Sequence, residues 1–398
     1  MAIKGNLVVG QSGGPTAVIN GSLAGVIAEA KKHKSIDKIF GMKHGIEGLL
    51  KKDFLDLTDC SLHTIQGLRV TPASALGGCR YKVRDNDYPQ ILEILKENNI
   101  RYFFYIGGND SMDTCNKISM LAEKEGYEMQ VIGVPKTIDN DLPVTDHCPG
   151  FGSAARYTAV STAGAGKDLE AMKTFDDVAI NEIMGRHAGW LAAASALAKN
   201  NFKDAPHLIY LPEREFSIEK FLEDVKAIHK ELGYVFVSIG EGIRDASGEF
   251  IGENKEDAVV DAFGHKAIAL GNGPAAYLAK VIKENLGLQA RYSRCGTIQR
   301  SFSECVSDTD YEEAYLVGLT AVKCAFEGKT GLMITLERTS NNPYTCVAGS
   351  VPLNKVANVE HFVPQEYINS QGNFVTDQFY EYCLPLIGKN LPRYVRLF

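Results

Sequence analysis

The stretch MQVIGVPKTIDND, residues 129–141, joins a short apolar run to one lysine, one threonine and two aspartates. The apolar residues 129–134 predict a buried β-strand, and Pro135 should end it because proline cannot donate a hydrogen bond to a neighbouring strand. The charged cluster 136–141 therefore follows the carboxyl end of a strand. Ligands bind at that edge of open α/β sheets, so this stretch predicts both a fold class and the position of a site.

Short apolar runs alternate with segments of helical periodicity on both sides of this stretch. The expected strands are 6–10, 38–42, 102–106, 178–184, 207–211 and 234–239. The expected helices are 16–31, 88–98, 111–124, 188–199, 218–232 and 275–285. This order predicts an α/β protein of two Rossmann-like lobes with mostly parallel sheets and an active site in the cleft between them. We expect lobes at 1–150 and 151–330, and a C-terminal extension, 331–398, that packs on both.

The composition is that of an ordinary globular enzyme and excludes some classes of partner. The chain has 398 residues and a formal net charge of -7, which argues against nucleic acid or an anionic membrane as the main partner. No apolar run approaches the roughly 20 residues that a membrane span needs. The start, MAIKGNLVVG, predicts a strand and not a secretory signal, because polar residues follow it at once. Nine scattered cysteines without a CxxC pair indicate reduced thiols and hence a cytoplasmic protein.

Two glycine-rich turns follow predicted strands and suit a phosphate ligand. In GQSGGP, residues 10–15, Gly13 and Gly14 let backbone N–H groups approach an anion, and the helix that follows adds positive partial charge. In GGNDS, residues 107–111, a carboxylate that can hold Mg²⁺ follows two glycines. Taken alone, the first motif also fits a plain tight turn and the second a helix cap. Both turns and the 136–141 cluster follow strands of one predicted sheet, and together they indicate phosphoryl transfer, which depends on charge neutralisation and alignment.

Five motifs, taken together and in this order, resemble the phosphofructokinase family. They are GGND at 107–110, PKTIDND at 135–141, MGRHAGW at 184–190, EG at 241–242 and GTIQR at 296–300, within a resemblance that spans roughly residues 5–330. The resemblance points to the pyrophosphate-dependent branch, because ATP-dependent members usually have glycine at the positions of Asp110 and Lys136. A carboxylate at the first position crowds and repels a nucleotide, whereas a lysine at the second adds charge for a small anionic donor.

The resemblance implies a role for each matching residue. Asp139 would be the general base that takes the proton from the 1-hydroxyl of fructose 6-phosphate. Its catalytic companions would be Lys136, Thr137 and Arg186. The implied pyrophosphate-binding residues are Gly13, Arg80, Gly108, Asp110 and Lys136. The implied sugar-phosphate-binding residues are Thr137, Ile138, Asp139, Asp141, Met184, Gly185, Arg186, Glu241, Arg291 and Arg300. Mg²⁺ is the implied cofactor, held by Asn109 and Asp110. Residues 1–150 would then form the phosphoryl-donor lobe and 151–330 the sugar-phosphate lobe.

Several positions depart from the family pattern. Asn109 stands where many members have a metal-binding aspartate, and Asp177 stands where an arginine usually holds the sugar phosphate. Thr297 replaces a common histidine or tyrosine, and Ser301-Phe302 replaces part of a frequent GGSP motif. Most of these changes fall on the sugar-phosphate side, so the donor is better specified than the acceptor.

The leading hypothesis is reversible phosphoryl transfer from pyrophosphate to the 1-hydroxyl of fructose 6-phosphate, a glycolytic reaction that gives fructose 1,6-bisphosphate and phosphate. The alternatives are an ATP-dependent 6-phosphofructokinase and a non-catalytic regulatory paralogue that binds phosphosugar, which Asn109 and Asp177 motivate. A dinucleotide-dependent dehydrogenase is disfavoured because the chain lacks GxGxxG with an acidic residue about 20 positions later. The resemblance also implies a homo-oligomer, a dimer or tetramer, since one sugar-phosphate arginine comes from a neighbouring subunit in the family.

Overall fold

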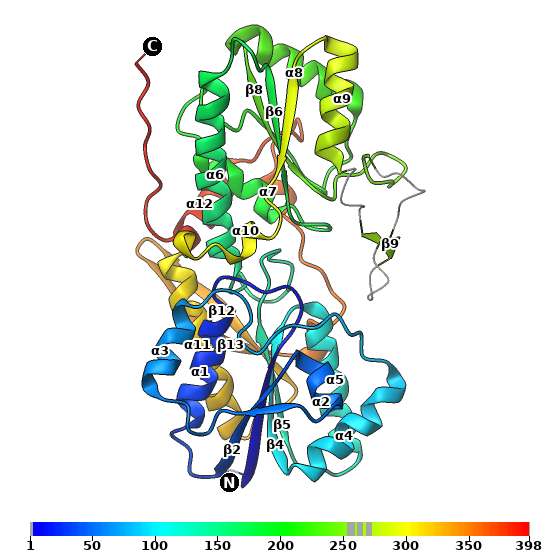
Figure 1. Ribbon diagram of the computed structural model, residues 1–398, viewed down its shortest axis with the longest axis vertical. Helices are drawn as coiled ribbons and strands as arrows, with labels where there is room; N and C mark the ends of the chain where they lie inside the picture. The colour runs from blue at the N-terminus through cyan, green and yellow to red at the C-terminus, as the bar shows by residue number, and fades with distance from the viewer. Residues whose placement is uncertain (1–2, 253–258, 261–265, 268–272, 398) are drawn as a thin grey trace. The chain divides into compact units, whose positions relative to one another are not determined.

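The computed structural model of the protein describes residues 3–252, 259–260, 266–267 and 273–397 (Figure 1). The chain divides into two compact units, each made of two separate stretches of sequence. The first unit combines Met1–Ser153 with Arg300–His361, and the second combines Ala154–Gln299 with Phe362–Phe398.

The first unit is built on a seven-stranded sheet of mostly parallel strands. The strand order is β13 (Tyr344–Pro352), β12 (Leu332–Asn341), β5 (Gln130–Pro135), β4 (Ile100–Gly107), β1 (Gly5–Gln11), β2 (Ile36–Met42) and β3 (Phe54–Asp56). The strands from β12 to β2 run parallel, and β13 and β3 pair antiparallel at the two edges. The carboxyl ends of β1, β4 and β5 therefore lie at one edge of the sheet, as the sequence predicted.

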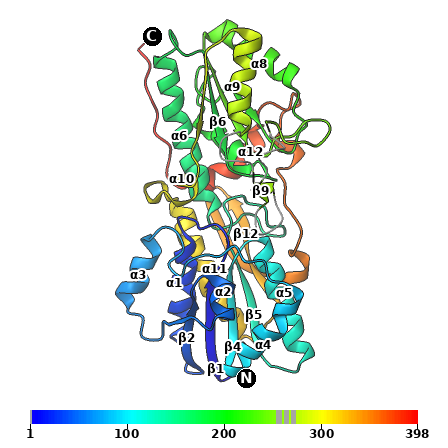
Figure 2. The same cartoon turned by 45° about the vertical axis from the view of Figure 1, so that its right-hand side comes forward.

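Helices cover both faces of this sheet (Figure 2). On one face lie α1 (Ile19–Ala30), α3 (Leu62–Val70) and α11 (Asp308–Phe326), and on the other lie α2 (Gly45–Leu50), α4 (Tyr88–Glu97) and α5 (Asn109–Lys124). Strand β4 shows why both faces are apolar: Tyr102 and Phe104 pack with the first set of helices, and Phe103 and Tyr105 pack with the second. Successive side chains of a strand point to opposite faces of the sheet. Because both faces are covered by helices here, every position of the strand is apolar.

Helix α11 belongs to the first unit because it packs closely on α1 through small residues. A Cβ atom added at Gly25 of α1 would lie 2.3 Å from the carbonyl oxygen of Tyr315, and one added at Gly318 would lie 2.0 Å from that of Ser22. The predicted boundary at 330 thus differs from the structure, in which the chain returns to the first unit at residue 300. The predicted boundary at 150 falls close to the division at Ser153.

The second unit is built on a four-stranded parallel sheet in the order β11 (Ala290–Arg294), β6 (Val178–Ile183), β8 (Val235–Gly240) and β7 (Leu208–Tyr210). Helices α8 (Ile218–Leu232) and α9 (Pro274–Leu286) pack on one face, and α6 (Phe151–Ala171) on the other. A short two-stranded sheet joins β9 (Val259–Val260) to β10 (Lys266–Ala267). The remaining helices are α7 (Trp190–Ala194), α10 (Ile298–Ser301) and α12 (Asp377–Cys383).

The predicted strands and most predicted helices are confirmed. Helix α8 illustrates the signals in the sequence that mark where a helix begins and ends. Its Ser217 side chain accepts a hydrogen bond from the N–H of Lys220 at the start, and Gly233 ends it with a positive φ of 78°. The predicted helix at 188–199 is shorter: α7 spans Trp190–Ala194 and a 3₁₀ turn continues to Ala198. Helices α6 and α11 and the β12–β13 hairpin were not predicted.

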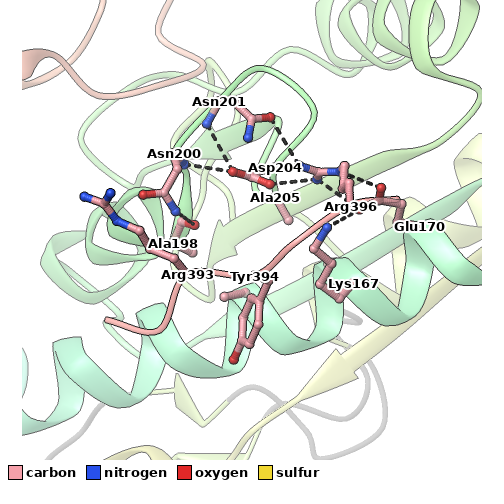
Figure 3. A pocket seen from close by; sticks show the side chains of 12 residues that line it. Lys167, Glu170, Ala198, Asn200, Asn201, Asp204, Ala205, Arg393, Tyr394 and Arg396 are labelled. Carbon is pink, nitrogen blue, oxygen red and sulfur yellow. Dashed lines mark hydrogen bonds and ion pairs between the residues drawn. The ribbon is translucent and has the colours of Figure 1, made fainter. Parts of the chain in front are cut away.

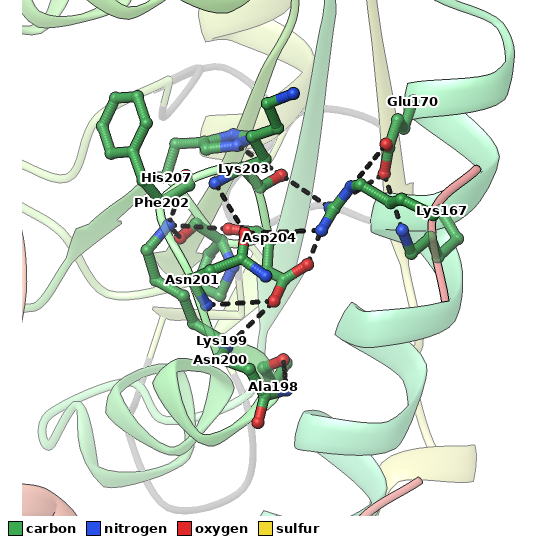
Figure 4. A network of polar contacts seen from close by, with 12 residues as sticks. Lys167, Glu170, Ala198, Lys199, Asn200, Asn201, Phe202, Lys203, Asp204 and His207 are labelled. Atoms are coloured by element: carbon green, nitrogen blue, oxygen red, sulfur yellow. Dashed lines mark hydrogen bonds and ion pairs between the residues drawn. The ribbon is translucent and has the colours of Figure 1, made fainter. Parts of the chain in front are cut away.

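The C-terminal extension is shared between the units, with 331–361 in the first and 362–398 in the second. In the second unit Arg396 anchors the tail by pairing with both carboxylate oxygens of Glu170, at 2.6 and 2.9 Å, and with Asp204 at 2.7 Å (Figure 3). These residues line a cavity of about 290 Å³, and the Asp204 carboxylate also accepts the backbone N–H groups of Asn200 and Asn201 (Figure 4). The cavity contains none of the predicted site residues.

Two predictions from composition can be compared with the structure. All nine cysteines are free thiols, as predicted. Across the described ranges, no helix combines the length and the apolar character needed to cross a membrane.

Candidate active site

The glycine turn after β1 is closed by two cations from distant parts of the first unit. The Lys136 ammonium donates a 2.7 Å hydrogen bond to the carbonyl oxygen of Gly14. A Cβ atom added at Gly14 would lie 2.7 Å from Nη1 of Arg300, so a side chain there would displace the guanidinium from its present position. Gly13 has a positive φ of 70°, a conformation that favours glycine. The turn, the lysine and the arginine therefore form one cationic group, which we call the cradle: Gly13, Gly14, Lys136 and Arg300.

Lys136 is buried, with 4% of its surface exposed. Burial lowers its pKa to about 8, although the carboxylates of Asp139 and Asp141 act in the opposite direction. The pKa of Arg300 is also lowered, first by burial and then by the charge of Arg80, while Asp139 raises it. The chain thus holds excess positive charge in a dehydrated place, and such an arrangement favours an anionic ligand.

The segment 137–141 folds into a turn that is bonded to itself and to the chain behind it. The Thr137 hydroxyl accepts the backbone N–H of Asp139 at 3.0 Å, and the Thr137 N–H donates to the carbonyl of Pro149 at 3.2 Å. Asn140 has a φ of 56°, and its Oδ1 accepts the N–H of Cys148 at 2.9 Å. Burial raises the pKa of Asp141. Ile138 is buried, and Asp139 is half-buried. The turn is therefore built to hold Asp139 next to the charges of the cradle.

The glycine turn after β4 is organised differently. Gly108 precedes α5, whose first residues are Asn109 and Asp110. The Asn109 amide donates to the carbonyl of Val359 and accepts the N–H of Asn358, both at 2.5 Å. The Asp110 side chain is exposed in the first turn of the helix. Of the two predicted metal ligands, Asn109 is thus committed to a structural contact, and Asp110 is the one whose carboxylate points to solvent.

Four predicted sugar residues of the second unit follow the carboxyl ends of β6 and β8: Met184, Gly185, Arg186 and Glu241. The fifth, Arg291, lies beside Ala179 near the start of β6. The N–H of Gly185 donates to Glu241 at 3.3 Å, and a Cβ atom added at Gly242 would lie 1.8 Å from the carbonyl oxygen of Arg186. Burial raises the pKa of Glu241, and the Arg186 charge partly opposes this shift. Met184 donates its N–H to the side chain of the buried Gln299 at 3.2 Å. Sequence reasoning did not assign Gln299 a role, although it lies inside the GTIQR motif.

Arg291 and Asp177 have structural partners here. Arg291 lies on β11 and pairs with Asp168 at 2.5 Å and Asp176 at 3.0 Å, so two carboxylates already balance its charge. Asp177 accepts the N–H of Gln289 at 2.8 Å and contacts His229 at 2.9 Å. Trp190 is buried, as expected of a core residue. Arg80 lies in the first unit, where its charge acts on Arg300.

The chain is similar to known proteins of one family. Residues 6–325 match the family model described as Phosphofructokinase. The pyrophosphate–fructose 6-phosphate 1-phosphotransferase of Xanthomonas campestris pv. campestris (strain B100) is 43% identical over 409 residues, which cover 99% of this chain and 96% of the relative. The crystal structure of a pyrophosphate-dependent phosphofructokinase from Nitrosospira multiformis has a TM-score of 0.88 at 41% identity, covering 99% of this chain and 94% of that one. A second such structure, from Marinobacter aquaeolei, has a TM-score of 0.87 at 40% identity, with coverage of 98% and 95%.

Proposed function

This chain belongs to the phosphofructokinase family, and from that premise we propose that it transfers a phosphoryl group from pyrophosphate to the 1-hydroxyl of fructose 6-phosphate. The products are fructose 1,6-bisphosphate and phosphate, and the reaction runs in either direction. The relatives named above are pyrophosphate-dependent, which favours this donor over ATP.

The observation that carries the proposal is the cradle. Pyrophosphate is compact and highly anionic, and the cradle offers it a buried ammonium, a guanidinium and a turn without side chains. Buried charge is costly unless it is paired, so the free protein keeps these cations at the expense of stability. A bound anion would remove that cost. The exposed carboxylate of Asp110 adds negative charge at the turn after β4, which disfavours the longer polyphosphate of a nucleotide.

The chemistry follows from the residues in each unit. The Asp139 carboxylate would accept the proton of the 1-hydroxyl as its oxygen attacks the terminal phosphorus of pyrophosphate. Lys136 and Arg300 would neutralise the charge that collects on the phosphate leaving group. In the second unit, Glu241 would accept hydrogen bonds from sugar hydroxyls, and Arg186 would bind the transferring phosphoryl group. Arg300 also matches the family's sugar-phosphate residues, so experiment must decide whether it binds pyrophosphate or fructose 6-phosphate.

We propose Mg²⁺ as the cofactor, held by Asp110 and by oxygens of pyrophosphate. One carboxylate plus substrate phosphates is a common way for proteins to bind this ion. Asn109 does not fit the role of a metal ligand in this structure, because its side-chain nitrogen and oxygen both form hydrogen bonds with the backbone of residues 358–359. When bound, Mg²⁺ would neutralise part of the donor's charge. Asp110→Asn should raise the Mg²⁺ concentration needed for half-maximal rate.

The cellular context is proposed from the family resemblance. We place the enzyme in glycolysis, in the cytoplasm, and as a homo-oligomer of two or four chains. Light scattering on the purified protein would give the number of chains, and a strictly monomeric active enzyme would contradict that part.

A coupled assay with both donors tests the proposed function. Purified protein, Mg²⁺ and fructose 6-phosphate are supplied with pyrophosphate or with ATP, and fructose 1,6-bisphosphate is measured. We expect turnover with pyrophosphate. Turnover with ATP alone would transfer the assignment to an ATP-dependent 6-phosphofructokinase, and binding of fructose 6-phosphate without turnover would indicate a regulatory paralogue.

A further inference from the structure

A buried histidine lies behind the predicted catalytic turn, and no step described above uses it. His147 is 2% exposed, and both of its ring nitrogens face carboxylates. Nδ1 lies 2.7 Å from Oδ2 of Asp146, and Nε2 lies 2.6 Å from Oε2 of Glu313. A neutral imidazole has one donor and one acceptor, so it would place a lone pair against one of these anionic oxygens. The geometry therefore favours a ring with protons on both nitrogens.

The neighbouring charges stabilise that protonated ring. Burial by itself lowers the pKa of His147, but the carboxylates of Glu313 and Asp146 outweigh it and raise the pKa to about 9. From β12, Arg338 donates to Asp146 at 2.8 and 3.1 Å. From β13, the Tyr344 hydroxyl donates to Glu313 at 2.6 Å. Cys346 also lies on β13, and its thiol pKa rises to about 12, mainly through burial and further through the charge of Glu313. From α11, Asp310 lies one turn before Glu313.

The segment 145–150 transmits this contact to the catalytic turn. Its Cys148 N–H is held by Asn140, and its Pro149 carbonyl accepts the N–H of Thr137. On its other side, the Thr145 hydroxyl accepts the N–H of Leu336 at 2.9 Å, and the N–H of Gly150 donates to Asp310 at 2.7 Å. Segment 145–150 therefore lies between α11 and β12 on one side and the turn that carries Asp139 on the other.

We propose that His147 is a positioning residue that fixes segment 145–150, and through it the catalytic turn 137–141, by bridging the carboxylates of Asp146 and Glu313. This inference rests on the proposed function for its kinetic consequence, but its structural part stands alone. The ring joins a side chain of its own segment to a helix that begins 161 residues later, so it sets how that segment sits on α11. The protonated ring donates to both carboxylates, and it loses one of these two hydrogen bonds when it gives up a proton, with a pKa of about 9.

The test compares His147→Gln and Glu313→Gln with His63→Gln, an exposed histidine on α3. Glutamine at 147 can donate to one carboxylate only. We expect kcat to fall on the order of 10²-fold with KM values near those of the wild type, because a small misplacement of the base affects the chemical step more than binding. His63→Gln should behave as the wild type. The double variant His147→Gln/Glu313→Gln should recover part of the lost kcat, since an amide can pair with an amide.

Amide hydrogen exchange supplies a readout that does not depend on turnover. Deuterium uptake of peptides covering 135–153 should rise in both single variants and stay unchanged in His63→Gln. If His147→Gln does not fold, deuterium uptake in Glu313→Gln still tests whether the bridge fixes segment 145–150. The ring titration of His147 should then move toward its ordinary pKa, and uptake of 135–153 should rise at a lower pH than in the wild type.

Two results would overturn the inference: a wild-type kcat in His147→Gln, or unchanged uptake in 135–153 when the ring is altered. A wild-type enzyme that turns over no donor would defeat the proposed function, and the exchange data would still score the positioning role separately.

Discussion

The glycine turns after β1 and β4 have similar compositions, yet their glycines make room for different neighbours. At the first turn, Gly14 leaves space for the Arg300 guanidinium. At the second, a Cβ atom added at Gly107 would lie 2.1 Å from the hydroxyl of Ser111, only four residues along the chain. The first glycine serves a site assembled from distant residues, and the second serves local packing at the start of α5. A glycine motif by itself therefore does not show which neighbours its glycines accommodate.

The largest expected effect tests whether the chemistry lies beside the first turn. Asp139→Asn removes the proposed base, and kcat should fall by roughly 10²- to 10⁴-fold with little change in thermal stability. Asp85→Asn is a control, since that carboxylate is 93% exposed. The measurement is the rate with saturating pyrophosphate and fructose 6-phosphate. A kcat equal to that of the Asp85 variant would remove Asp139 from the mechanism.

The next largest effect tests whether Lys136 binds pyrophosphate specifically, by comparison with another lysine whose pKa is lowered. Lys136→Met keeps most of the volume and removes the charge, and kcat/KM for pyrophosphate should fall by about 10- to 10²-fold, since a charged hydrogen bond contributes roughly 1.5–3 kcal/mol. Lys199 is a control in the second unit: it is half-buried, and partial burial likewise lowers its pKa to about 8. Lys199→Met should lower the melting temperature without changing KM for pyrophosphate. Equal changes of KM in both variants would contradict a specific role for Lys136.

The pH dependence follows from the pKa of Lys136, which is about 8. A bound anion favours the ammonium form, so below pH 8 the free protein already carries the proton that binding needs. Above it, binding must take up a proton, and KM for pyrophosphate should rise by as much as about tenfold per pH unit. Steady-state kinetics on both sides of pH 8 should show this rise in the wild type and not in Lys136→Met. A rise that persists in the variant would assign it to another group.

The smallest expected effects compare the two glycines directly. Gly14→Ala should displace the mobile end of Arg300, raise KM for pyrophosphate several-fold and leave the melting temperature nearly unchanged. Gly107→Ala forces backbone or Ser111 to shift, and overpacking of this kind costs roughly 1–3 kcal/mol of stability. Thermal melts and KM values for both variants give the answer. If Gly14→Ala loses stability and keeps its KM, the two turns do not differ as described.

Most of the fold was predictable from the sequence because its strands are continuous apolar runs and its helix ends carry clear signals, as Ser217 and Gly233 do for α8. The β12–β13 hairpin was missed because Thr339 to Pro352 is rich in polar residues that suit an exposed edge. Helix α11 was missed because its packing on α1 uses alanine and glycine, which give weak apolar periodicity.

The proximity of candidate site residues was predictable where they share a motif, as Lys136 and Asp139 do. It was less so where function depends on distant partners. Sequence showed that Asn109 departs from the family, but only the structure shows its amide bonded to residues 358–359. Arg291 matched a phosphate-binding position, yet Asp168 and Asp176 balance its charge here. The position of His147 between two carboxylates was not predictable, because no motif marks Asp146 or Glu313 as its partner.

The most direct test of the account is a crystal structure of the protein soaked with pyrophosphate and Mg²⁺, and a second soaked with ATP. We predict two linked phosphates within hydrogen-bonding distance of the Lys136 ammonium and the glycine turn after β1, and no ordered nucleoside in the second crystal. Adenosine seated beside Asp110, with Lys136 turned away from the phosphates, would contradict it.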